Sequence, residues 1–153
     1  ATNKNKELIS SYVLNESIQN LEIINDDKIK TAVLKKSIFA VVKSGTVSLE
    51  VCKMNVPSII IYKMNFINFY LAKFLLNIKF ANMINIINNK EVIPELIQSE
   101  CNADEIFKSV YYFLKKPDLV TKQKQEIKKT LETLSSPSSS TEEASNIILS
   151  YIF

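Results

Sequence analysis

Residues 38–62 of the chain read IFAVVKSGTVSLEVCKMNVPSIIIY, and this stretch decides the predicted fold. It contains two apolar runs, 38–42 and 58–62, that have the length of β-strands and show no alternation with polar residues. Runs of this kind are typical of strands that are buried on both faces of a parallel sheet. Parallel neighbours need a crossover connection, which is usually a helix. We therefore predict a strand–helix–strand unit.

The crossover helix is expected between the two runs, because Val47, Val51 and Met54 recur there at helical spacing. A third strand candidate lies upstream at 21–24, and a helix follows it, for which Asp26 has the features of an N-cap. The order strand, helix, strand, helix, strand is typical of α/β proteins. We predict a parallel sheet with crossover helices that is followed by C-terminal helices.

Outside this region the chain is predicted to be mainly helical. The expected helices cover 4–17, 65–79, 118–134, the residues after a capping pair at Asn102 and Glu105, and those after a capping box at Ser140 and Glu143. The serine-rich stretch 135–140 has the composition of a flexible linker. The predicted organisation is a partial α/β domain over 1–134, a linker over 135–140 and an amphipathic helix over 141–153.

The composition excludes several classes of function. The 153 residues carry 19 basic and 16 acidic side chains without a dense basic stripe, which disfavours a nucleic-acid binder. There is no histidine, so histidine-based catalytic triads and metal sites are excluded. Cys52 and Cys101 are too few for a zinc cluster and are expected to be reduced thiols in a cytoplasmic protein. Neither a metal-binding acidic cluster nor a transmembrane segment is recognisable, and no cofactor is expected.

The single glycine of the chain lies in Ser44-Gly45-Thr46, directly between a predicted strand and a predicted helix. A helix that starts there directs backbone N–H groups and the positive end of its dipole at a ligand. Glycine permits close approach of the backbone, and the two hydroxyls add donors. This arrangement fits a phosphate or pyrophosphate. An ordinary strand-to-helix turn without a ligand is an equally good interpretation of these three residues.

Four further polar residues are candidates for ligand contacts, and each has a simpler alternative. Glu50 lies one helical turn after Thr46 and could accept hydrogen bonds from ribose hydroxyls, or it could be a half-exposed surface residue. Glu95 and Gln98 follow a proline at the spacing of one helix face and could contact a sugar or a diphosphate, or they could form a solvated first turn. Asn85 lies in an apolar stretch and needs a partner, either the backbone or a ligand.

The predicted helix over 65–79 is not cleanly amphipathic. Phe66 and Phe69 lie among asparagines and Lys73, away from its main apolar face. Exposed phenylalanine next to lysine suits a membrane surface or a lipid substrate, while burial on both sides of the helix is the alternative.

Taken together, these segments resemble the lipid-A-disaccharide synthase family. The resemblance is carried by SGTVSLE at 44–50, PSIIIYK at 57–63, Asn85, and VIPELIQ at 92–98, which agree with the family in order and spacing. It extends from about residue 40 to residue 114, and the preceding residues from 4 onward are compatible with it. The resemblance implies an α/β fold with a partial doubly wound parallel sheet, the C-terminal donor-binding domain of a GT-B glycosyltransferase, followed by C-terminal helices. It also implies that the enzyme needs neither a metal ion nor a cofactor. Such an enzyme transfers 2,3-diacylglucosamine from its UDP derivative to 2,3-diacylglucosamine 1-phosphate in lipid A biosynthesis, with inversion at the anomeric carbon.

The resemblance also assigns seven residues to a site for the UDP-sugar donor. The loop for the nucleotide diphosphate would be formed by Ser44, Gly45 and Thr46, the ribose-facing carboxylate by Glu50, and the polar surroundings of the donor sugar by Asn85, Glu95 and Gln98. Asn88 and Asn89 stand where the family usually has small residues, including glycine. Asparagine tolerates the left-handed backbone region that glycine often adopts.

Members of this family need an N-terminal domain that binds the acceptor and is expected to hold the catalytic base. No base can be named in this chain, which opens with Ala1, and the first strand of the donor domain is expected upstream of that residue. We therefore expect the C-terminal part of a longer or split enzyme, inactive alone, in the cytoplasm and peripherally on the inner membrane. Its expected partners are the UDP-diacylglucosamine donor, the diacylglucosamine 1-phosphate acceptor, the missing N-terminal half and the membrane surface, but no nucleic acid.

Two alternatives stay open. The chain could be a non-catalytic remnant or interaction module that docks through its last helix, or a peripheral lipid-binding protein without a nucleotide site. Binding of UDP separates a donor domain from both of these.

Overall fold

The computed structural model describes residues 3–15, 19–65, 79–134 and 140–152. The chain forms two compact units, 1–38 and 39–153, and each is described by itself. Most of the helix predicted over 65–79 and most of the predicted serine-rich linker lie outside the described residues. The division of the chain at that linker therefore stays a prediction.

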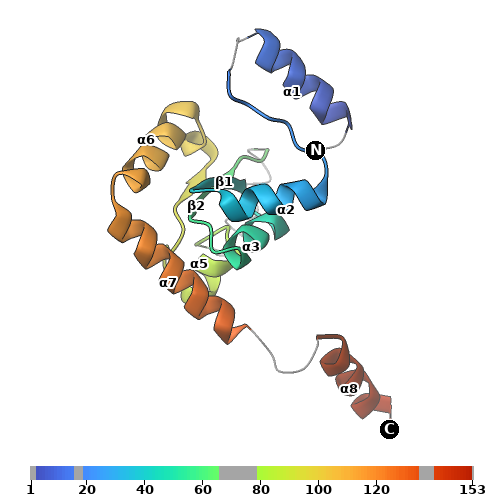
Figure 1. Cartoon of the computed structure of the whole chain (residues 1–153). Coiled ribbons are helices and arrows are strands. Elements are labelled where there is room, and N and C mark those ends of the chain that lie inside the picture. The colour runs from blue at the N-terminus through green and yellow to red at the C-terminus, as the bar shows by residue number, and fades with distance from the viewer. Residues whose placement is uncertain (1–2, 16–18, 66–78, 135–139, 153) are drawn as a thin grey trace. The chain divides into compact units, whose positions relative to one another are not determined.

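The first unit contains two helices and the chain between them (Figure 1). Helix α1 (Asn3–Asn15) agrees with the helix predicted near the N-terminus, and α2 (Asp27–Lys36) follows Asp26. The Asp26 Oδ1 accepts hydrogen bonds from the backbone N–H groups of Lys28 (2.8 Å) and Ile29 (3.0 Å). Asp26 is therefore the predicted N-cap, because its side chain satisfies donors that the first helical turn leaves unpaired.

The strand predicted at 21–24 is wrong. Residues 21–26 follow an irregular path, and the described part of this unit holds no strand with which they could pair. A strand is stable only when a neighbour takes up its backbone hydrogen bonds, and the apolar character of Ile23 and Ile24 does not supply one. The described sheet of the chain therefore begins in the second unit.

The second unit is built on a three-stranded parallel sheet in the order β1–β2–β3. The strands are β1 (Ala40–Lys43), β2 (Ser58–Tyr62) and β3 (Glu95–Ile97). Val42 of β1 lies opposite Ile60 of β2, and Ile60 lies opposite Glu95 of β3. The predicted α/β class is confirmed, and the three strands follow one another across the sheet in chain order.

Burial differs between the strands. The centre of β2 is fully enclosed, with Ile59 and Ile60 at 0% exposure. In β1, Val42 is buried but Val41 is 45% exposed. The prediction that both apolar runs are buried on both faces therefore holds for the centre of β2 and is wrong for β1. The reason is that successive residues of a strand point to opposite faces, and the described residues cover the face of β1 that carries Val42 but not the face that carries Val41.

Helix α3 (Thr46–Lys53) is the predicted crossover from β1 to β2, but it presents a different face to the core. Val47 is 45% exposed, whereas Ser48, Val51 and Cys52 are buried. The serine can be buried because its hydroxyl has hydrogen-bond partners inside the unit. The part of the predicted apolar stripe that rests on Val47 is therefore wrong, and a buried serine takes its place.

The helical turn predicted after Pro94 is also wrong, because the residues after it pair with β2 as a strand. The Pro94 carbonyl accepts a hydrogen bond from the Ile60 N–H at 2.8 Å, so the ladder begins at a residue that lacks a donor of its own. Strand β3 is followed by Gln98, whose φ of 54° lies in the left-handed region. Glu95 and Gln98 therefore do not share a helix face.

The remaining described elements of the unit are helical. They are α5 (Met83–Asn88), the 3-10 turn η1 (Gln98–Glu100), α6 (Ala103–Leu114), α7 (Pro117–Thr133) and α8 (Ser140–Ile152). The Asn102 Oδ1 accepts the Glu105 N–H at 3.0 Å, so the predicted cap of α6 is confirmed. The predicted helices over 118–134 and after Ser140 are confirmed as well. Asn89 follows α5 with a φ of 47°, in the left-handed conformation expected to be tolerated there.

Helix α7 packs against α3, α5 and α6 (Figure 1), and its residue Gln123 fixes the start of β2. Gln123 is buried at 3% exposure. Its Oε1 accepts the Ser58 N–H at 2.9 Å, and its Nε2 donates to the carbonyl of Ser58 at 3.0 Å and to that of Val92 at 3.4 Å. One side chain therefore satisfies both backbone groups of the first β2 residue inside the core.

Replacing Gln123 by methionine, which has a similar volume, leaves the N–H and the carbonyl of Ser58 without their partner. The free energy of unfolding should fall by about 2–4 kcal/mol, because each buried group left without its hydrogen bond costs about 1–3 kcal/mol. Urea denaturation of the full chain, followed by circular dichroism, measures the change. Gln125→Met, at an exposed position of the same helix, is the matched control and should change the free energy by less than about 0.5 kcal/mol. Equal midpoints for the two variants would contradict the anchoring role of Gln123.

The reactivity of the Cys52 thiol provides a second test, of whether the core around α3 is enclosed. Cys52 is 2% exposed, and burial raises its pKa to about 11. Because the thiolate is the reactive form, roughly one Cys52 in a thousand would be reactive at pH 8. In a Cys101→Ser background, labelling by Ellman's reagent should be slow in native buffer, faster as the pH rises toward the pKa, and complete in denaturing urea. Rapid labelling at pH 8 without urea would show that Cys52 is not enclosed.

Candidate functional site

The ends of the three strands place several candidate residues at one edge of the sheet. Parallel strands all end at the same edge, and ligands of open α/β sheets bind outside it. Strands β1, β2 and β3 end at Lys43, Tyr62 and Ile97. Ser44-Gly45-Thr46 follows β1 and Gln98 follows β3, so the structure brings both candidates to the carboxyl edge.

Gly45 has a backbone conformation that glycine adopts far more readily than other residues. Its φ of 136° and ψ of −161° lie outside the regions open to residues with a Cβ atom. It is the N-cap of α3, yet it has no side chain that could accept the N–H groups of the first helical turn. Gly45 and Thr46 are both exposed. The start of α3 therefore offers backbone donors and the positive end of a helix dipole to an anion.

The Ser44 hydroxyl ties this turn to a second segment of the chain. Its Oγ donates to the Ala81 carbonyl at 2.6 Å, and the Ser44 N–H donates to the Ile61 carbonyl at 3.4 Å. The hydroxyl proton is therefore used inside the protein in this structure. What Ser44 contributes here is the position of the turn, because it fixes the residue before Gly45.

The Glu95 carboxylate, at the first position of β3, organises the same segment. Its Oε2 accepts the Ala81 N–H at 2.6 Å, and its Oε1 accepts the Asn82 N–H at 2.9 Å and the Asn85 Nδ2 at 2.7 Å. Hydrogen bonds to an ionised acceptor are stronger than those between neutral groups. Glu95 therefore holds the chain before α5 against the start of β3.

Asn85 is fully buried, and its amide is saturated within the protein. The Oδ1 accepts the N–H groups of Val92 (2.8 Å) and Ile93 (2.9 Å), while the Nδ2 donates to the Ile93 carbonyl and to Glu95 Oε1, both at 2.7 Å. Of the two partners considered for this residue, the structure shows the backbone, together with Glu95. A sugar could contact Asn85 only by displacing these hydrogen bonds.

Gln98 and Glu50 occupy separate parts of the site. Gln98 holds the chain that leaves β2, because its Oε1 accepts the Met64 N–H at 2.9 Å and its Nε2 donates to the Met64 carbonyl at 3.2 Å. Glu50 is half-buried on α3, one turn after Thr46. Glu50 therefore lies one helical turn after Ser44-Gly45-Thr46, whereas Gln98 approaches the same edge from β3.

The structure joins three of the predicted residues, Ser44, Asn85 and Glu95, in one hydrogen-bond network. The links between them are Ala81 and Asn82, which no sequence motif identified. Asn82 could have been found as the N-cap of α5, since asparagine is a favoured cap before an apolar run. Ala81 takes part through its backbone alone, so no pattern of side chains could have identified it.

Lys43, the last residue of β1, brings positive charge to this edge. Its Nζ lies 5.8 Å from the centre of the Tyr62 ring, at the end of β2. A lysine in this position adds to the attraction of the helix dipole for an anion. Among the described residues, no three histidine, cysteine, aspartate or glutamate side chains gather closely enough to hold a metal ion.

A groove of about 400 Å³ lies elsewhere on the unit, beside the residues that precede β3. Apolar atoms of Val92, Pro94 and Leu119 line it together with an ion pair between Lys90 and Glu126, whose atoms are 2.9 Å apart. The hydrogen bond from Lys90 lowers the pKa of the Glu126 carboxyl. None of the seven predicted site residues lines this groove.

Comparison with known proteins identifies one family. A sequence profile of the lipid-A-disaccharide synthetase family matches residues 1–148. Similar proteins include the lipid-A-disaccharide synthases of Rickettsia bellii (strain OSU 85-389), 41% identical over 98 residues, and of Persephonella marina, 33% identical over 102 residues. These matches cover 64% and 67% of this chain and 26% and 27% of the relatives. The lipid-A-disaccharide synthase 1 of Legionella pneumophila (strain Lens) is 30% identical over 132 residues, which is 86% of this chain and 34% of that protein.

The chain thus spans about a quarter to a third of the length of the relatives that it matches. The resemblance of residues 40–114 to this family is confirmed, and the match extends upstream to the first residue. The parallel sheet with its crossover helix agrees with a partial GT-B domain. On the strength of a family match over nearly its whole length, the chain belongs to the lipid-A-disaccharide synthetase family, a family of glycosyltransferases.

Proposed function

We propose that this chain is the C-terminal, donor-binding part of a lipid-A-disaccharide synthase that acts in lipid A biosynthesis. The reaction would transfer 2,3-diacylglucosamine from its UDP derivative to 2,3-diacylglucosamine 1-phosphate, with inversion and without a metal ion. One observation carries the proposal: the turn Ser44-Gly45-Thr46, here called the glycine turn, opens α3 at the carboxyl edge of the sheet in a chain of this family.

The glycine turn would bind the diphosphate of the donor. When the bond between the sugar and the diphosphate breaks, negative charge grows on the leaving UDP. Backbone N–H groups that already point at this position stabilise the charge without having to reorganise. Lys43, immediately before the turn, adds a positive charge at the same edge.

Glu50 and Gln98 would contact the nucleoside and the sugar. A carboxylate one turn into α3 is in a position to accept hydrogen bonds from vicinal ribose hydroxyls. Gln98 uses one donor and one acceptor on Met64, which leaves one proton and one lone pair of its amide for a ligand. Asn85 and Glu95 would support the donor site without contacting the donor. Their hydrogen bonds hold the segment 81–85, and Ser44 of the glycine turn binds the Ala81 carbonyl of this segment.

The acceptor site and the catalytic base would come from the N-terminal part of the enzyme. Inverting transfer needs a base that removes the proton of the acceptor hydroxyl. Histidine, the commonest such base, is absent from this sequence, and the chain matches at most 34% of the relatives described above. We therefore propose that the chain alone binds UDP-sugar weakly and forms no disaccharide.

Gly45→Ala should weaken the binding of UDP about tenfold, since a non-glycine residue at this φ carries backbone strain of about 1–3 kcal/mol. An added Cβ would meet no atom within 4 Å, so the effect comes from backbone strain and not from a clash. Isothermal titration of the full chain with UDP measures the affinity. Asn55→Ala is the matched control, because Asn55 also has a positive φ, 56°, but follows the opposite end of α3.

The control variant should bind UDP as tightly as the unaltered chain. Equal affinity for Gly45→Ala would show that the glycine turn is not the diphosphate site. If the unaltered chain binds no UDP even when the N-terminal half is supplied, the non-catalytic remnant or interaction module becomes the better explanation.

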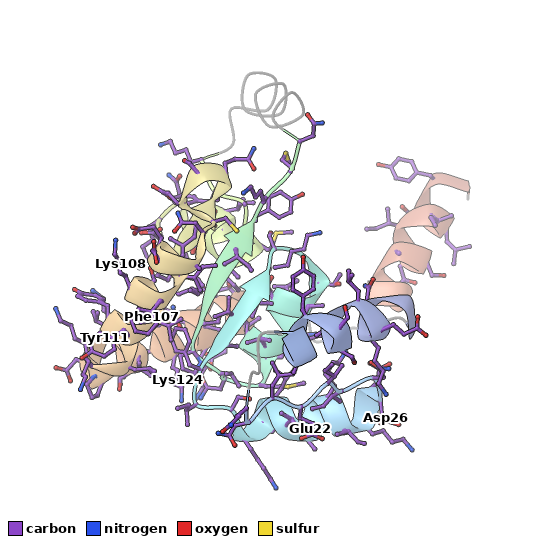
Figure 2. The ribbon with its side chains drawn as sticks, turned by 90° about the horizontal axis from the view of Figure 1, so that it is seen from above. Glu22, Asp26, Phe107, Lys108, Tyr111 and Lys124 are labelled. Carbon is purple, nitrogen blue, oxygen red and sulfur yellow. The ribbon has the colours of Figure 1, made fainter. Side chains whose placement is uncertain are left out.

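We also propose that the enzyme contacts the cytoplasmic face of the inner membrane, where acylated substrates lie. None of the helices in the described part of the chain is both long and apolar enough to cross a membrane. A surface for peripheral contact is offered by α6, where Phe107 and Tyr111 are 68% and 53% exposed and stack with ring centroids 6.0 Å apart. Figure 2 shows both rings on α6 with Lys108, and Lys124 on the neighbouring α7.

The charges around these rings suit anionic lipid. Between Glu105 and Asp118 the sequence contains three lysines and no carboxylate. Lys108 donates to Glu105 at 2.7 Å, and this hydrogen bond raises the pKa of its ammonium group, while the Glu105 carboxylate offsets its charge. Lys115, whose Nζ lies 5.4 Å from the centre of the Tyr111 ring, supplies positive charge beside the rings. Aromatic rings flanked by lysines favour the interface of an anionic bilayer. Most of the helix predicted over 65–79, for which a membrane or lipid contact and burial on both sides are both open, lies outside the described residues, so its role stays a prediction.

The double substitution Phe107→Ser and Tyr111→Ser should remove most of the binding of the full chain to vesicles of phosphatidylethanolamine and phosphatidylglycerol. The reason is that it deletes the apolar part of the surface and keeps the lysines. Flotation measures the bound fraction, which should also fall with added salt. Leu134→Ser, at a residue that is 52% exposed after the end of α7, is the control and should float normally. Equal flotation of both variants would contradict the role of α6.

A further inference from the structure

Asn82 makes two different side-chain hydrogen bonds although it is fully buried. Its Oδ1 accepts the Ile84 N–H at 2.9 Å, which caps the start of α5. Its Nδ2 donates to the Ser48 Oγ at 3.0 Å. The first bond explains why an asparagine suits this position, since capping needs an acceptor. The second is not needed for capping and leads to α3, which is far from Asn82 in the sequence.

The Ser48 hydroxyl carries this contact on to Gly45. Its Oγ donates to the Gly45 carbonyl at 2.6 Å while it accepts from Asn82. A hydroxyl has one proton, so accepting from the amide leaves that proton for the glycine carbonyl. The three groups therefore form a directed chain of hydrogen bonds from Asn82 through Ser48 to Gly45.

Ala81 and Asn82 together also hold the residue on the other side of Gly45, Ser44. The Ala81 carbonyl accepts from the Ser44 hydroxyl at 2.6 Å, and the N–H groups of Ala81 and Asn82 are both bound by Glu95. The segment 81–82 thus contacts the residue before Gly45 through a carbonyl and Gly45 itself through Ser48. Because Glu95 belongs to the sheet, these hydrogen bonds fix the segment 81–82 to the sheet.

This support fixes the Gly45 peptide through its carbonyl, which accepts the Ser48 Oγ and also the Ser48 N–H at 3.1 Å. No atom lies within 4 Å of the position where a Cβ would stand, and its φ of 136° is one of several conformations that glycine adopts at little cost. We propose that Asn82, acting through Ser48, is a positioning residue that fixes the Gly45 peptide so that the first N–H groups of α3 point at a diphosphate. This inference rests on the proposed donor site and adds to it two residues that touch no ligand.

Two substitutions test the proposed role of the hydrogen bonds from Asn82 through Ser48 to Gly45. Asn82→Ser keeps an acceptor for the cap of α5, but the serine side chain is too short to reach α3. Ser48→Ala removes the hydroxyl that links Asn82 to Gly45. Titration of the full chain with UDP and with uridine should show about 5–10-fold weaker UDP binding in each variant, and less than twofold change for uridine, which has no phosphate. The double variant should be no weaker than either single variant, since both break one chain of bonds.

Asn88→Ser is the matched control. Asn88 lies on the same helix and also donates through Nδ2, to the Ile84 carbonyl and to Thr130 Oγ1, both at 2.7 Å, but it has no link to the glycine turn. Its affinity for UDP should equal that of the unaltered chain. If Asn82→Ser does not fold, Ser48→Ala carries the test.

Three results would overturn the inference. They are unchanged UDP affinity in the variants, an equal loss of uridine and UDP affinity, and multiplicative losses in the double variant. Absence of UDP binding by the unaltered chain, even when the N-terminal half is supplied, would instead overturn the proposed donor site and with it the role of Asn82 and Ser48. The two failures are therefore distinguishable by the behaviour of the unaltered chain.

Discussion

The carboxyl edge of the sheet in the second unit depends on a single carboxylate that is bound by N–H groups from another segment. Glu95 begins β3, and its two oxygens accept hydrogen bonds from Ala81, Asn82 and Asn85. A glutamine at this position could not do the same, because it would turn an NH₂ group toward one of two adjacent backbone donors. Through this contact the segment before α5 is fixed to the sheet, and Ser44 is fixed to that segment in turn. The glycine turn, α5 and β3 therefore keep their places together.

Strand β2 is held at both of its ends by glutamine side chains. Before the core of the strand, Gln123 binds the N–H and the carbonyl of Ser58, and beyond its end Gln98 binds the N–H and the carbonyl of Met64. A primary amide offers one donor and one acceptor side by side, as the backbone of a neighbouring strand does. Strand β3 pairs only with residues 60–62 of β2. The two amides bind backbone groups of β2 and of a residue beyond it that the short β3 does not reach.

The features that could be predicted from the sequence are those with local signals. An N-cap lies within three residues of the groups that it binds, so Asp26 and Asn102 were predictable, and a lone glycine between strand and helix marked Gly45. Strand β3 was missed because three residues have no period of their own and their partner, β2, lies far away in the sequence. In the candidate site, Glu95 could be singled out by its type and position, but its role could not, because Ala81 contributes backbone groups alone.

Strand β1 pairs with β2 on one side, and none of the described residues pairs with it on the other. An open strand edge presents N–H and carbonyl groups that can template the addition of an extended segment from another molecule. Natural proteins oppose such addition with lysine at the edge, and Lys43 stands at the end of β1 beside a half-exposed Val41. A single lysine opposes such pairing only weakly, because β1 offers the backbone groups of four residues. Self-association of the isolated chain through this edge is therefore expected to grow with its concentration.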